Sequence, residues 1–149
     1  MIIPGTRTKN HKSLELTLPG AALDILASVP RGNGRDFVFG RNDDAPFSGW
    51  SAGKLRLDAR IAMMTGKSLA PWVLHDLRRT MRTGLSVIGV QPHIAELVIN
   101  HVKGGVEAIY DRHTYRAEIK AALARWAEHL VALVENRTCN VVNLRGATQ

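Results

Sequence analysis

The pattern of apolar and polar positions predicts a mainly α-helical protein with one small β-hairpin. Three stretches, residues 50–64, 75–88 and 115–135, place their apolar residues on one side at helical spacing. Shorter helices are predicted at 19–28, which opens with a proline, and at 92–99, with a further helical turn at 107–110. Ile2-Ile3 and the alternating residues 14–18 predict two paired strands, because the segment between them is polar and cationic.

The predicted helix at 75–88 is the most informative of these elements. His75, Arg79 and Arg82 share one arc of this helix. Arg78 falls at the edge of that arc, a position that suits a guanidinium whose stem is packed while its head faces a site. Gly89 is predicted to end the helix. A second arc, about 130° away at about 100° per residue, holds the apolar residues Leu77, Met81, Leu85 and Ile88.

The net charge of the chain indicates what kind of molecule it binds. The 20 lysines and arginines exceed the 13 acidic residues, so the formal net charge is +7. Such an excess favours a polyanionic partner such as nucleic acid, although scattered surface charge on a basic soluble protein is the alternative. No run of about 18 apolar residues occurs, so we expect a cytoplasmic protein with no membrane partner. Cys139 is the only cysteine, which excludes an intramolecular disulfide and a cysteine-based zinc site.

One ordered set of residues points to a family. His75-Asp76-Leu77-Arg78 resembles the His-x-x-Arg box of the tyrosine recombinases, the phage integrases in particular. His101 follows 23 residues after Arg78, and Tyr110 follows nine residues after His101, at the spacing of that family. Lys9 lies in the predicted hairpin loop, where the family carries a lysine. The resemblance covers residues 1–137, as the C-terminal part of a catalytic domain, and 138–149 are expected to form a loose tail.

The resemblance implies a mainly α-helical catalytic domain that cleaves and rejoins DNA without metal or other cofactor. Tyr110 would attack the scissile phosphate and form a 3′-phosphotyrosine link. Arg78 would hold the non-bridging oxygens with its planar fork. Lys9 would protonate the departing 5′ oxygen, while His75 would assist proton transfer and His101 would hydrogen-bond the phosphate.

Other residues remain open at this point. Tyr115 competes with Tyr110 as the nucleophile, and Lys12 competes with Lys9. The expected partners are double-stranded DNA and other recombinase protomers, on which the last helix can dock in this family. The residues expected to contact DNA are Arg79, Arg82, Lys12 and Arg7.

One part of the family pattern is missing from this sequence. The family uses a second arginine, in a Gly-x-Arg-x-x-Glu-like segment upstream of the hairpin, and we expect that the chain has lost this upstream end. Two other functions therefore stay open. The first is a catalytically inactive DNA-binding remnant of an integrase from a phage or mobile element. The second is a small helical DNA-binding regulator that uses residues 92–99 in a helix-turn-helix.

Overall fold

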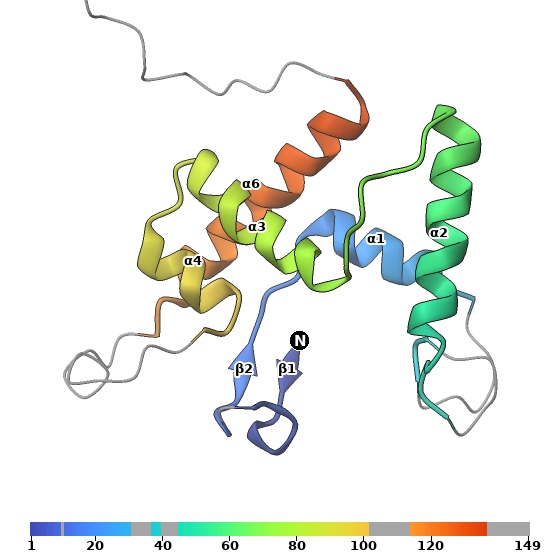
Figure 1. Cartoon of the computed structure of the whole chain (residues 1–149). Helices are drawn as coiled ribbons and strands as arrows, with labels where there is room; N and C mark the ends of the chain where they lie inside the picture. The colour runs from blue at the N-terminus through green and yellow to red at the C-terminus, as the bar shows by residue number, and fades with distance from the viewer. Residues whose placement is uncertain (10, 31–36, 40–44, 102–113, 137–149) are drawn as a thin grey trace, which may run out of the picture. The chain divides into compact units, whose positions relative to one another are not determined.

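The protein is mainly helical, with one two-stranded antiparallel sheet, as the hydrophobic pattern predicts. The computed structural model describes residues 1–9, 11–30, 37–39, 45–101 and 114–136 (Figure 1). The predicted helical turn at 107–110 and the tail at 138–149 lie outside these residues. The elements are β1 (Ile2–Ile3), the 3-10 turn η1 (Gly5–Arg7), β2 (Leu14–Glu15), α1 (Gly20–Ser28), α2 (Trp50–Thr65), α3 (His75–Val87), α4 (Pro92–Val98) and α6 (Arg116–Val134).

The chain forms two compact units. The first unit comprises Met1–Leu23 together with Thr80–Gln149, and the second comprises Asp24–Arg79. The boundary passes through α1 and through α3, so α3 begins in the second unit and ends in the first.

The core of the first unit lies where α3, α4 and α6 meet. Leu85 of α3 is completely buried there. Only part of the predicted apolar arc of α3 is buried in this core. Leu77, at the start of the arc, is 60% exposed. Proline at the first position of α4 suits a helix start, since the first helical amides have no partner inside the helix. The buried residues of this core are Leu85, Val90, Ile94, Ala95, Val98, Ile119 and Ala122.

The hairpin joins this core through its second strand. Ile2 pairs with Glu15 and Ile3 with Leu14, in antiparallel register. The amide of Leu16 donates to the carbonyl of Met1 at 2.9 Å, and the Leu16 side chain packs against the core. An ion pair of 2.8 Å between Arg116 and Glu15 connects the hairpin to the start of α6.

The end of α3 is closed as its sequence predicts. Gly89 has a φ of 76°, the left-handed conformation that glycine adopts without steric cost. This turn lets the amide of Val90 donate to the carbonyl of Leu85 at 2.9 Å. The guanidinium of Arg125, on α6, donates to the carbonyl of Ile88. The carbonyls that α3 leaves without helical partners are therefore satisfied partly by another helix.

The helix α6 begins one residue later than predicted, because Tyr115 takes a left-handed φ of 46° as its N-cap. The tyrosine ring is half-buried against the core and makes an edge contact with His93, with the ring centroids 5.3 Å apart. The first half of the predicted apolar stripe is buried through Ile119, whereas Leu130 and Leu133 near its end are exposed.

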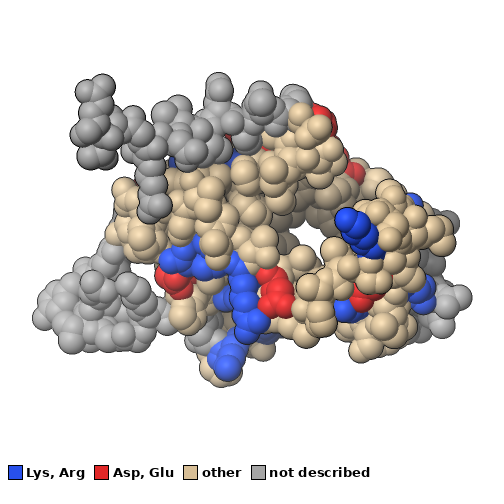
Figure 2. All heavy atoms as spheres, turned by 45° about the horizontal axis from the view of Figure 1, so that its top comes forward, with Lys and Arg blue, Asp and Glu red and all other residues tan. Residues whose placement is uncertain are grey.

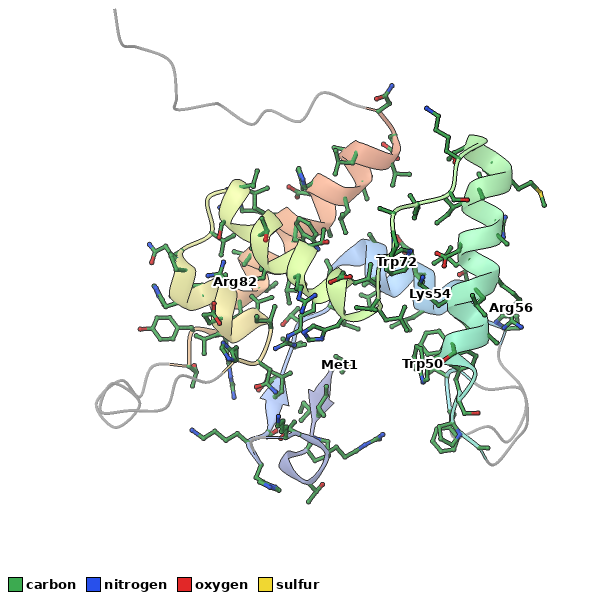
Figure 3. The ribbon with its side chains drawn as sticks, viewed as in Figure 1. Met1, Trp50, Lys54, Arg56, Trp72 and Arg82 are labelled. Atoms are coloured by element: carbon green, nitrogen blue, oxygen red, sulfur yellow. The ribbon has the colours of Figure 1, made fainter. Side chains whose placement is uncertain are left out.

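In the second unit, a small polar network fastens the segment after α2 to that helix. Asp58 accepts hydrogen bonds from Lys54 at 2.7 Å and from the indole of Trp72 at 2.8 Å (Figure 3). The Lys54 ammonium also lies 4.9 Å from the centre of the Trp72 ring. These donors, Lys54 first, lower the pKa of Asp58.

Much of the predicted apolar side of α2 is exposed rather than buried, namely Leu55, Leu57 and Met64.

We predict that replacing Gly84 by alanine destabilises the first unit. A β-carbon at Gly84 would lie 2.2 Å from Cζ3 of Trp126, so the indole must shift. We expect the free energy of unfolding in urea to fall by about 1–2 kcal/mol, because overpacking outweighs the helix propensity that alanine gains. Gly53→Ala is the control, since its β-carbon would lie at an ordinary 3.6 Å from the Phe47 ring. A Gly84→Ala protein more stable than the parent would contradict the packing described.

Candidate active site

The first predicted site residues lie at the start of α3. His75 is the first residue of the helix, and both His75 and Arg78 are exposed. Residues three apart on a helix are neighbours on its surface. The helix therefore presents this imidazole and this guanidinium on one exposed surface.

Asp76 secures this end of the helix. Its carboxylate accepts a hydrogen bond of 2.9 Å from the backbone amide of Val73 and one of 2.6 Å from Arg79. These two donors, the amide first, lower the pKa of Asp76. The Arg79 side chain is still 69% exposed, so it remains accessible to a polyanion. An exposed ion pair at this spacing contributes little to stability.

Arg82 is held by two partners. Its Nε donates to Oε1 of Glu96 at 2.6 Å, and its Nη1 donates to the hydroxyl of Ser86 at 2.7 Å. Only 29% of the side chain is exposed. The guanidinium thus connects α3 to α4 within the first unit (Figure 3). Its predicted contact with DNA stays a prediction.

His101 is placed by the way in which α4 ends. Asn100 takes a left-handed φ of 54°, which asparagine tolerates better than most residues. The amide of His101 then donates to the carbonyl of Glu96 at 2.8 Å, and that of Asn100 donates to Leu97 at 2.9 Å. This pair of bonds is the Schellman motif. It folds the chain back, so that Nδ1 of His101 lies 2.5 Å from Oε2 of Glu96.

Glu96 is the residue of the candidate site that sequence reasoning missed. It accepts Arg82 on one oxygen and His101 on the other. These two hydrogen bonds, Arg82 first, lower the pKa of its carboxyl group. A signal was available, because Glu96 is the only acidic residue in the helix 92–99 and precedes His101 by five positions.

The cationic residues of the hairpin loop lie on its outside. The hydroxyl of Thr8 lies 3.1 Å from the carbonyl of Gly5 and 2.8 Å from that of Lys12, which closes the loop on itself. A β-carbon at Gly5 would lie 2.5 Å from the carbonyl oxygen of His11, so glycine is needed for this close approach. Around this turn, the side chains of Arg7, Lys9 and Lys12 are exposed.

The predicted catalytic residues divide between the two units. Lys9 and His101 belong to the first unit, whereas His75 and Arg78 belong to the second. Tyr110, the predicted nucleophile, lies outside the described residues. Its competitor Tyr115 is half-buried in the packing at the start of α6, which gives that tyrosine a structural role.

Figure 2 shows acidic groups next to basic ones on the face that it draws.

Within residues 1–9, 11–30, 37–39, 45–101 and 114–136, no three histidine, cysteine or acidic side chains are placed to hold a metal ion. No helix in that part of the chain is long and apolar enough to cross a membrane.

Comparison of the chain with family models, with curated proteins and with solved structures gives no significant match.

We predict that the pairs of Glu96 stabilise the fold in a pH-dependent way. Because the folded pKa of Glu96 lies below its ordinary value of 4.5, this stabilisation is complete above pH 4.5 and is lost as the pH falls below it. Glu96→Gln should lower the free energy of unfolding by about 0.5–1 kcal/mol at pH 7, since the pairs are partly exposed.

Urea unfolding of the parent and Glu96→Gln proteins at stepped pH measures this effect. The difference between them should shrink as the pH falls below 4.5. Glu128→Gln, at an exposed position of α6, is the control and should change stability by less than about 0.5 kcal/mol. A difference that grows towards low pH would refute the pairing of Glu96.

Proposed function

We propose that this chain is part of the catalytic domain of a tyrosine recombinase of the phage-integrase kind, acting in site-specific DNA recombination or integration. The observation that carries the proposal is the ordered set Lys9, His75, Arg78, His101 and Tyr110 at the spacing of that family. The exposed surface that His75 and Arg78 share on α3 supports it.

In the proposed reaction, the Tyr110 oxygen attacks the scissile phosphorus. A phosphotyrosine bond forms on the 3′ side, and the bond from phosphorus to the 5′ oxygen breaks. Lys9 gives its proton to that departing oxygen. The tyrosine gives its proton to a base, and His75 assists this proton transfer. Arg78 and His101 stabilise the charge that develops on the non-bridging oxygens. Because the phosphodiester energy is kept in the covalent link, rejoining requires no nucleotide cofactor.

Sequence-independent contacts with the DNA backbone are assigned to exposed cations. Arg7 and Lys12 on the hairpin loop and Arg79 on α3 have accessible side chains. Arg82 is a weaker candidate, because only 29% of its side chain is exposed, against 69% for Arg79. A protein that contacts phosphates in this way releases counterions on binding, so its affinity falls with salt.

A second function is favoured by one observation. No Gly-x-Arg-x-x-Glu-like segment occurs in this sequence. Without that arginine, one preorganised cation is missing from the site, which lowers the rate by a factor on the order of 10²–10³. A protein whose whole chain lacks this segment would bind DNA without cleaving it, as the remnant of an integrase.

We predict that the protein forms a covalent adduct with DNA through Tyr110 when its reading frame is continued upstream to restore the second arginine. Nicked duplexes that tile the DNA flanking its coding sequence are incubated with the protein, and with a version whose reading frame is continued upstream. An adduct that survives denaturation is expected, and it should be absent with Tyr110→Phe, which lacks only the nucleophilic oxygen. No adduct with either version, or an adduct that persists in Tyr110→Phe, sinks the recombinase proposal. Salt-sensitive binding without any adduct identifies the remnant instead.

We predict different effects of the two arginines of α3 on DNA binding. Arg79→Gln should weaken binding and make the slope of log affinity against log salt less steep by about one, the contribution of one phosphate contact. Arg82→Gln should leave the slope unchanged, because its guanidinium is largely covered and is engaged by both Glu96 and Ser86. Fluorescence anisotropy of a labelled duplex at several salt concentrations measures both. Equal slopes for the two variants would contradict the assignment.

A further inference from the structure

We propose that Glu96 is a positioning residue for His101, whose imidazole it holds by Nδ1 so that Nε2 is the ring atom that meets the DNA phosphate. The positioning itself follows from contacts within the first unit. The role of Nε2 towards a phosphate rests on the proposed function.

The carboxylate of Glu96 is held from two sides. Its Oε1 accepts Nε of Arg82 at 2.6 Å, and its Oε2 lies 2.5 Å from Nδ1 of His101. Ser86 accepts a second N–H of the same guanidinium, which orients Arg82 on α3. The Schellman motif at the end of α4 fixes the backbone of His101 relative to Glu96. The imidazole is therefore oriented by its backbone and by one ring nitrogen, while its side chain stays 69% exposed.

The chemistry of the pair determines which ring nitrogen carries the proton. The lowered pKa of Glu96 keeps it ionised at neutral pH, and an ionised carboxylate only accepts hydrogen bonds. Nδ1 of His101 must then be the donor. In the neutral ring, Nε2 has no proton and can only accept, whereas in the imidazolium Nε2 also donates.

This protonation pattern has a consequence for the reaction. The non-bridging oxygens of a phosphodiester only accept hydrogen bonds, so Nε2 can donate to them only when His101 is an imidazolium. His101 then acts as a cation in cleavage. The charged groups that face it among the described residues are Glu96 of α4 and, behind that carboxylate, Arg82 of α3.

The tautomer of His101 tests the positioning without any DNA. Long-range ¹H–¹⁵N correlation spectra of the full chain, labelled with ¹⁵N-histidine, distinguish the two neutral tautomers, and His101→Gln assigns the signals. The parent protein should show the Nδ1–H form at pH values where the ring is neutral. Glu96→Ala should shift the ring towards the Nε2–H form that free imidazole side chains prefer.

Arg82→Met is the matched control, since it removes the other partner of Glu96 and keeps the carboxylate. It should retain the Nδ1–H form. If Glu96→Ala does not fold, Glu96→Gln replaces it, because a neutral amide can serve either tautomer and so removes the preference. An Nε2–H ring in the parent, no change on replacing Glu96, or the same shift in Arg82→Met overturns the proposal.

The adduct assay tests the mechanistic consequence. His101→Gln should slow adduct formation relative to the parent, because it removes the imidazolium that donates to the phosphate. Glu96→Gln should slow the reaction by roughly tenfold or more, the scale of a lost supporting hydrogen bond. The double variant should be no slower than His101→Gln, because Glu96 acts through His101. Additive losses overturn the positioning role, whereas no adduct from the parent or from the version continued upstream refutes only the recombinase function and leaves the tautomer result intact.

Discussion

The first unit depends on the packing of α3 against α4 and α6 around Leu85. This leucine is fully buried, and the residues that surround it come from segments widely separated in the sequence. The approach of α6 is close enough that Trp126 occupies the space beside Gly84, where a side chain would collide with the indole. Removing large apolar side chains from water at this junction supplies the stabilisation that short helices such as α4 cannot supply by propensity alone.

The polar features of the candidate site are consequences of that packing. Because α3 and α4 meet at the core, Arg82 reaches Glu96, and the carboxylate is then shared with His101. The same helix therefore carries one arginine available to a polyanion, Arg79, and one neutralised within the protein, Arg82. Formal charge alone does not distinguish these two roles, since it counts both residues equally.

Much of the local structure followed from the order of residues. The helices were predicted from helical periodicity, the hairpin from alternation, and the end of α3 from its glycine. Each of these signals is a property of a short segment of sequence. Arg78 was placed at the edge of the arc that holds His75 for the same reason, since residues three apart on a helix are neighbours on its surface. Which part of each apolar stripe is buried was not predictable, as Leu77 shows: its exposure depends on what lies opposite the helix.

The sequence by itself determined the secondary structure, the basic balance of charge and the spacing that resembles an integrase site. Each of these is a one-dimensional property, fixed by residue types and by the geometry of a single element. Only the tertiary structure decided that Arg82 is engaged, that Tyr115 is a packing residue and that Glu96 holds His101. These facts depend on contacts between α3, α4 and the start of α6. Such contacts arise from burial of a shared core, and no local rule specifies which partners that core will bring together.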